Sequence, residues 1–360
     1  MRLALAGLGM ALCSLTEAAD LASRSAPPAL AGSYATPLRT LSSTRAPIGD
    51  WFGWVGQAVC DENGDSYFLV ARPITSGSNQ VGPRAVLRMS ADGTKRFSFT
   101  PAAVPELARA HDLQTVGFAL NPDPDGGLFL LVWAETGGQG RQYILAFDKN
   151  GEYRSHVKVD SREILAERFE AFGSGKFLLH GRWPDRPEPR LAVLSAAGGE
   201  VKDVVGWSGK YKPLEDPSPA NAGSARFDQV VRGGDGRIYL AQLDARQGED
   251  VVYAFRPSGE GGEAFTLRPM PKAPLLLGWK AAGRRFAAAY QSAEPQPAAS
   301  TNEHRGSFWI AVYDNGAVGG DLQPTVYGPA PGPPICYRHE GSGDRFTFLQ
   351  NGKLVTMSAR

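Results

Sequence analysis

The sequence of 360 residues has little of what metal centres need. It holds 3 cysteines and 5 histidines, and no two histidines stand at ligand spacing. The histidines are His111, His156, His180, His304 and His339. Because a zinc site needs three or four convergent ligands, we predict no metal and no cofactor. The Asp-rich stretches 61–65 and 123–126 lack the terminal Glu of a calcium loop, so we interpret them as turns.

Several other classes of function also lack their signatures. No serine lies in a Gly-x-Ser-x-Gly elbow, so no nucleophile is identified and we favour a protein without catalytic activity. The net charge is +1, with basic residues scattered among acidic ones, which argues against a nucleic-acid partner. Beyond the N-terminus no apolar run is long enough to cross a membrane, so we predict no membrane span.

The N-terminus has the pattern of a secretory signal peptide. Arg2 precedes an apolar run over 3–12, and the small residues Ala18 and Ala19 follow. We predict a signal peptide over 1–19 and a secreted or periplasmic protein; the alternative is an N-terminal helix or a misassigned start. A lipoprotein at Cys13 is disfavoured because the bulky Leu12 precedes it. Residues 20–36, rich in Ala, Ser and Pro, are predicted to form a flexible linker.

What the sequence does have is glycine (43), proline (27) and a repeated phrase. The phrase is clearest over 227–259: an apolar strand, the turn Gly234-Asp235-Gly236, a second strand, a loop and a third strand. Asp-Gly and Asn-Gly between apolar runs signal hairpins, because glycine accepts the positive φ of such turns. The short segments 105–110 and 161–167 are instead predicted to be helical connectors.

Weaker copies of the phrase give six units at a spacing of roughly 47–61 residues, each with about four short strands. We predict an all-β, six-bladed β-propeller of four-stranded antiparallel blades, one domain over 37–360, and expect a monomer. The last unit has three strands, and residues 38–43 are predicted to supply the fourth and close the ring. The alternative is an open pair of β-sandwiches.

The phrase over 234–240, followed by Val252-Tyr253-Ala254-Phe255, resembles the NHL-type and TolB-like six-bladed propeller repeats. Residues 61–70 and 144–151 are similar, so the resemblance covers most of 50–360. It implies the fold only, since relatives include scaffolds, carbohydrate-associated binding proteins, lactonase-like hydrolases and lyases. The ligand set of the metal-dependent lactonase-like members cannot be matched here.

Antiparallel blades place the connections between blades and the loops between second and third strands on one face. In this sequence those segments are long, at 72–83, 182–190, 208–224 and 292–306, whereas the turns of the opposite face are short. We predict that function lies on this long-loop face; the alternative is that the loops are tolerated insertions.

The candidate ligand-binding residues are aromatic or charged residues near the starts of inner strands. They are Trp54, Arg168, Arg226, Asp228, Trp279 and Arg338. Guanidinium forks and aromatic rings around a central pocket suit a carboxylate or a glycan. The alternative for each is structural: tryptophans pack between blades, and arginines pair with neighbouring acids.

Cys60 and Cys336 fall in the inner strands of the first and last units, which favours a disulfide between them. However, Cys60 abuts its turn while Cys336 lies four residues before its own. At about 3.3 Å per residue this offset is about 13 Å, which argues against a bridge and for two buried thiols.

The sequence therefore predicts a secreted propeller that binds an unidentified small molecule, glycan or protein without chemistry. The alternative is a hydrolase or lyase with its active site at the central channel. Convergence of an acid–base pair at the axis would favour that alternative.

Overall fold

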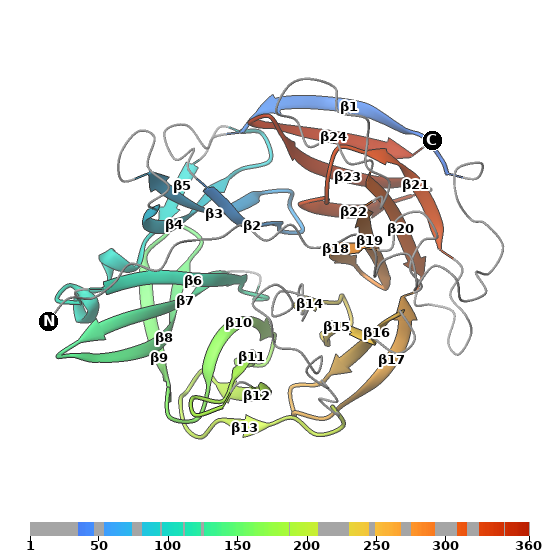
Figure 1. Ribbon diagram of the computed structural model, residues 1–360. Coiled ribbons are helices and arrows are strands. Elements are labelled where there is room, and N and C mark those ends of the chain that lie inside the picture. Colours follow the sequence, from blue (N-terminus) through green and yellow to red (C-terminus); the bar gives the residue numbers. More distant parts are fainter. Residues whose placement is uncertain are drawn as a thin grey trace, which may run out of the picture.

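The protein is a ring of six four-stranded antiparallel sheets, seen along its axis in Figure 1. The computed structural model describes 35–46, 54–73, 81–93, 96–110, 112–123, 126–186, 188–207, 230–244, 249–267, 275–291, 308–314, 324–341 and 343–359. The predicted signal peptide and most of the predicted linker lie outside these residues. Within them, the predicted all-β six-bladed propeller is confirmed.

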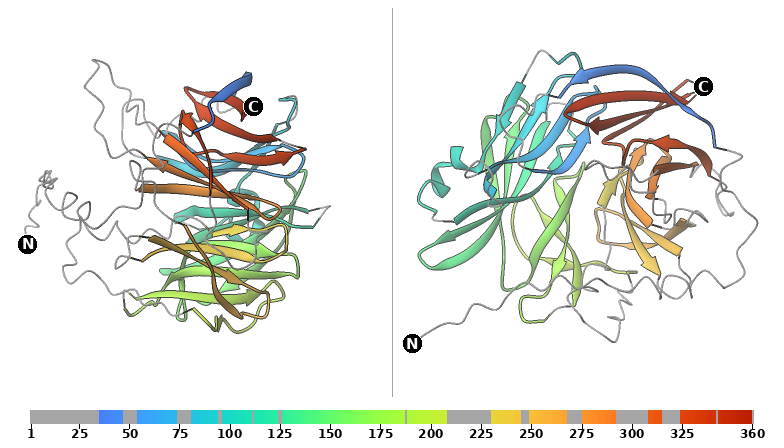
Figure 2. Two further views of the ribbon diagram at one scale, coloured as in Figure 1. Left: turned by 90° about the vertical axis from the view of Figure 1, so that its right-hand side faces the viewer. Right: turned by 45° about the horizontal axis from the view of Figure 1, so that its top comes forward.

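We number the blades I to VI in chain order. The strands of each blade are given from the innermost to the outermost. Blades I to III comprise β2 (Trp54–Cys60), β3 (Ser66–Pro73), β4 (Val81–Met89) and β5 (Arg96–Phe99); β6 (Asp112–Leu120), β7 (Gly126–Thr136), β8 (Gln139–Asp148) and β9 (Tyr153–Val159); and β10 (Leu165–Phe172), β11 (Lys176–Arg182), β12 (Pro189–Ser195) and β13 (Lys202–Asp203). Blades IV to VI comprise β14 (Val230–Arg232), β15 (Ile238–Asp244), β16 (Glu249–Phe255) and β17 (Gly261–Leu267); β18 (Leu275–Ala282), β19 (Arg285–Gln291), β20 (Phe308–Asp314) and β21 (Thr325–Ala330); and β22 (Cys336–Glu340), β23 (Gly343–Gln350) and β24 (Lys353–Ala359), completed by β1 (Leu38–Arg45). The strands run across the thickness of the ring (Figure 2).

The ring closes through the N-terminal strand, as predicted. β1 pairs antiparallel with β24, from Leu38 opposite Ala359 to Arg45 opposite Lys353, and it lies outermost in blade VI (Figure 1). Pairing begins slightly earlier than expected: Thr36, within the predicted linker, donates its N–H to the Val326 carbonyl at 2.9 Å. The closing segment therefore contacts blades V and VI.

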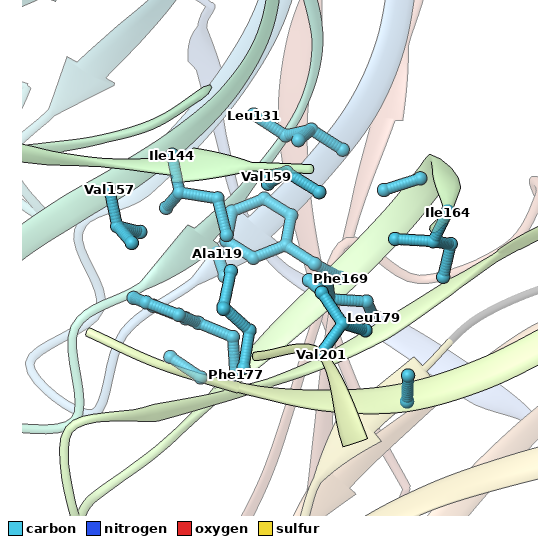
Figure 3. Close-up of a cluster of buried hydrophobic side chains, with 14 residues drawn as sticks. Ala119, Leu131, Ile144, Val157, Val159, Ile164, Phe169, Phe177, Leu179 and Val201 are labelled. Carbon is cyan, nitrogen blue, oxygen red and sulfur yellow. The ribbon is translucent and has the colours of Figure 1, made fainter. Parts of the chain in front are cut away.

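The hydrophobic core is divided among the interfaces between blades. Six clusters of buried side chains occur in the described residues, and each joins two neighbouring blades. Figure 3 shows the one between blades II and III, where Ile144 and Val159 face Phe169 and Phe177. Burying a side chain of this size stabilises the fold by about 1.5–3 kcal/mol, so these interfaces hold the ring together.

The middle strands of a blade have neighbours on both faces, and their sequences reflect this. β11 is buried over five consecutive residues, from Phe177 to Gly181, because both faces pack against other blades. The outermost strand β1 is almost entirely exposed and carries Ser, Thr and Arg. The turn from β14 to β15 needs glycine at Gly236, whose φ is +76°.

The predicted helical connectors are corrected in part. Residues 101–107 form two 3-10 turns, η2 (Pro101–Ala103) and η3 (Pro105–Leu107), but 161–167 is not helical. The Asp160 carboxylate accepts the Arg162 N–H at 3.0 Å and forms a turn, and β10 follows at once. Ile164 and Ala166 are buried with a period of two, which favours a strand. Within the described residues, no helix has the length and hydropathy to span a membrane.

Cys60 and Cys336 form a disulfide between blades I and VI, with their Cα atoms 5.2 Å apart. The estimated offset of about 13 Å is therefore wrong, because it assumed that neighbouring turns are level. Arg338, two residues beyond Cys336, donates to the carbonyls of Asp61 and Glu62 in the turn that follows β2. β22 thus extends past the end of β2, which brings the two cysteines opposite each other.

Candidate functional site

Three ionisable side chains on the inner strands of three blades interact electrostatically: the charges of Arg232 and Lys280 both act on Glu170. Glu170 lies on β10, Arg232 on β14 and Lys280 on β18, and these inner strands surround the centre in Figure 1. Each residue is among the last three of its strand, next to a short turn. We call these three residues the axial cluster.

The alternation of a β-strand explains how a charged residue reaches the axis from an apolar strand. Trp279 and Lys280 are consecutive and therefore point to opposite sides of β18. Trp279 is only 1% exposed and packs on Phe286 in the core between blades IV and V. Lys280 consequently points to the other side of β18, away from that interface.

Hydrogen bonds show how far these side chains extend. The Lys280 ammonium donates to the Ala58 carbonyl at 3.0 Å. Ala58 belongs to blade I and Lys280 to blade V, which are not neighbours, so the lysine reaches across the centre. Glu170 accepts the N–H of Ala171 at 3.0 Å. The Nη1 atom of Arg232 is buried and has no hydrogen-bond partner among the described residues.

The surroundings shift the pKa values of the acid and the amine towards neutrality. Burial raises the pKa of Glu170 to about 7, although the Ala171 N–H and the charges of Arg232 and Lys280 act in the opposite direction. Burial lowers the pKa of Lys280 to about 8, against the effect of Glu170. All three side chains retain partial exposure, yet burial is the largest cause of the pKa shifts of Glu170 and Lys280.

The six predicted ligand-binding residues do not come together in one site. Arg168 is exposed on β10, two residues before Glu170, and therefore lies on the same side of that strand. Trp279 is part of the core, and Arg338 binds turn carbonyls on the short-turn face. Trp54 begins β2, but its side chain lies outside the described residues, as do Arg226 and Asp228 entirely. Of the six, Arg168 is the one placed beside the axial cluster.

Sequence reasoning missed the axial cluster because it considered the starts of inner strands and not their ends. A signal was present. Glu170 stands between Phe169 and Ala171, and Lys280 between Trp279 and Ala281, each shortly before a turn. An ionisable residue inside an apolar strand is expensive to bury, which marks it as a candidate functional residue.

A second polar cluster joins blades V and VI. The carboxylate of Asp344, which is 3% exposed, accepts hydrogen bonds from the hydroxyl groups of Tyr327 at 2.5 Å and Tyr337 at 3.0 Å. The Nδ1 atom of His339 lies 2.8 Å from the same carboxylate. These bonds join Tyr327 of blade V to residues of blade VI, so we interpret this cluster as a structural connection between the blades.

Other sites are less well defined. Two hollows of about 340 and 390 Å³ adjoin turns of blade IV, and both are lined by Arg237 and Arg256. Neither hollow includes a residue of the axial cluster. Within the described part of the chain, no three His, Cys, Asp or Glu side chains form a group suited to a metal ion.

Comparison with known proteins concerns the fold alone. No family model and no curated protein matches the sequence. Similar solved structures include a putative TolB from Agrobacterium tumefaciens (10% identity, TM-score 0.43, 85% of this chain and 90% of that one). The β-propeller domain of the Trilobed protease from Pyrococcus furiosus (12%, 0.41, 84% and 80%) and the Hadza microbial sialidase Hz136 (12%, 0.47, 84% and 65%) are also similar.

The chain spans 64% of the Kuenenia stuttgartiensis hydrazine synthase chain that it resembles and 65% of the sialidase. The class that the structure defines is a six-bladed β-propeller with structural similarity to TolB and other propellers.

Proposed function

We propose that the protein is a propeller-type binding module, of the NHL-repeat-like or TolB-like kind, that holds a small ligand at the axial cluster. The observation that carries this proposal is the convergence of Glu170, Arg232 and Lys280 from three blades, close enough for the charges of both cations to act on Glu170. The N-terminal pattern supports the further proposal that this module is secreted or periplasmic. We also propose that it acts as a monomer.

The energetic argument is that the ring does not need these charges. Taking an ionisable group out of water costs several kcal/mol unless it is well paired, and Arg232 leaves a buried N–H without a partner among the described residues. An apolar residue would pack at such a position without this cost. Rigid strands hold the three groups in fixed positions, which is the arrangement that a binding site requires.

The prediction that recognition takes place on the long-loop face remains a prediction. Residues 74–80, 208–229 and 292–307, which include most of those loops, lie outside the described residues. The axial cluster lies nearer the opposite face, beside the short turns, so the two proposals name different ends of the ring axis.

A hydrolase or lyase is the second candidate, and one observation favours it. Glu170 and Lys280 have pKa values of about 7 and 8, so an acid and an amine change charge near neutral pH at one site. General acid–base catalysis is most efficient with groups of this kind.

A ligand-retention experiment tests the proposal. The protein is incubated with a cell-extract metabolite mixture, unbound molecules are removed by ultrafiltration, and retained ones are identified by mass spectrometry. We expect wild type and the control Arg237→Gln to retain a ligand that the double variant Arg232→Gln/Lys280→Met does not retain. Circular dichroism confirms that the variants fold.

Equal retention by all variants, or retention by none, would contradict a site at the axial cluster. Time-dependent conversion of the retained molecule, lost in Glu170→Gln, would favour the hydrolase or lyase.

A further inference from the structure

We infer that the ligand of the axial cluster is a small carboxylate anion, and that it binds together with a proton held by Glu170. This inference rests on the proposed function and specifies the chemical class of its ligand.

The first argument is charge. With Glu170 ionised, the axial cluster carries two positive charges and one negative charge, and with Glu170 neutral it carries two positive charges. Among the described residues, Glu170 is the acid whose charge affects the pKa of Lys280. Lys280 and Arg232 are the cations whose charges affect the pKa of Glu170. An excess of positive charge among largely buried groups is unfavourable until an anion balances it. The site therefore selects an anion over a neutral or cationic molecule.

The second argument is the set of hydrogen-bond donors without acceptors. An ammonium group has three N–H donors, and one of those of Lys280 goes to the Ala58 carbonyl. Arg232 presents its buried Nη1 without a partner among the described residues. A carboxylate offers two oxygens that accept from a guanidinium and an ammonium at once. The matching neutral amide has one oxygen, and its NH₂ group would face these donors.

The third argument is the proton. A ligand carboxylate beside Glu170 places two carboxyl groups in one site, and like charges at such distances do not both ionise. Glu170 already has a pKa of about 7, so it is the group that keeps the proton. Its O–H can then donate to the ligand. Above pH 7 Glu170 is ionised in the free protein, so binding must take up a proton from solution. The affinity therefore decreases as the pH rises through 7.

Saturation-transfer NMR with matched pairs of probes tests the inference. The pairs are acetate and acetamide, lactate and lactamide, and benzoate and benzamide, each at pH 6 and pH 8. We expect at least one carboxylate to bind while its amide does not. With a pKa of about 7, the dissociation constant should be about tenfold lower at pH 6 than at pH 8.

Variants separate the roles of the three residues. Arg232→Gln should weaken binding about tenfold or more, the effect of one charge-assisted hydrogen bond, whereas the control Arg237→Gln should not. Glu170→Gln keeps a donor and cannot ionise. It should bind at pH 6 like wild type and lose most of the pH dependence, leaving the decrease that follows from Lys280 near pH 8.

The inference is overturned if no carboxylate binds, if the amides bind equally well, if affinity increases at pH 8, or if inorganic phosphate binds in place of every carboxylate. Its failure differs from failure of the proposed function. If a neutral or cationic molecule is retained through the axial cluster, the proposed binding module is supported and the carboxylate ligand is contradicted. If retention is unchanged in the double variant Arg232→Gln/Lys280→Met, the axial cluster is not the binding site.

Discussion

Glu170→Gln should change how the stability of the protein depends on pH, even with no ligand present. In the folded protein the pKa of Glu170 is about 7, against an ordinary value of 4.5. Between these values the folded state keeps a proton that the unfolded state releases. The contribution of Glu170 to the free energy of unfolding therefore decreases as the pH rises from 4.5 to 7 and is constant above 7.

The magnitude follows from the shift. Each pKa unit corresponds to about 1.4 kcal/mol, which gives a loss of about 2.5 kcal/mol for this residue between pH 5 and pH 8. Partial exposure reduces this value, so we expect about 1–2.5 kcal/mol. Glutamine cannot ionise, so the variant should lack this loss and gain stability relative to wild type as the pH rises.

Urea unfolding followed by tryptophan fluorescence at pH 5, 6, 7 and 8 measures the effect. Glu167→Gln is the matched control, because Glu167 is an exposed residue on the same strand. The reasoning is refuted if wild type and Glu170→Gln show the same change between pH 5 and pH 8, or if the control shows the change instead.

Two further predictions concern the contacts between blades. Cys60→Ser removes the Cys60–Cys336 disulfide, whose sequence separation is 276, and should lower the free energy of unfolding by about 2–5 kcal/mol. Reduced wild type should unfold at the same urea concentration as the variant, and reduction should raise the intact mass by two hydrogen atoms. If reduction changes neither the unfolding midpoint nor the mass of wild type, the bridge is contradicted. Asp344→Asn replaces a buried acceptor of two tyrosine hydroxyls by an amide, and should cost about 1–3 kcal/mol in urea unfolding. Asp185→Asn, at an exposed acid of blade III, is its control and should change stability little.

The architecture could be predicted because its signals are local and repeated. Turns such as Gly233–Arg237, with apolar runs on both sides, occur once or twice per blade and fix strand number and order. The closing role of β1 followed from counting strands, since one blade lacked its fourth. These features depend on sequence neighbours alone, so no knowledge of distant contacts was needed.

The site and the disulfide could not be predicted because they depend on the relative height of different blades. Whether Glu170 and Lys280 meet is decided by how β10 and β18 are shifted along the axis, more than 100 residues apart in sequence. The same shift brings Cys336 opposite Cys60, although counting from the turns places them apart. The helix expected over 161–167 failed for a different reason: the contacts of Ile164 and Ala166 outweighed local helix propensity.

The pairing of β1 with β24 also has a consequence for synthesis on the ribosome. Thr40 emerges early, whereas its partner Met357 follows roughly 300 residues later. At about 5–20 residues per second, β1 waits on the order of 15–60 seconds while blades I to V are made. Throughout that time blade VI is absent, and the apolar faces of blades I and V that it will cover remain open to other chains. A polar, almost fully exposed β1 suits this wait, because a strand of Ser, Thr and Arg has little tendency to aggregate before its partner arrives.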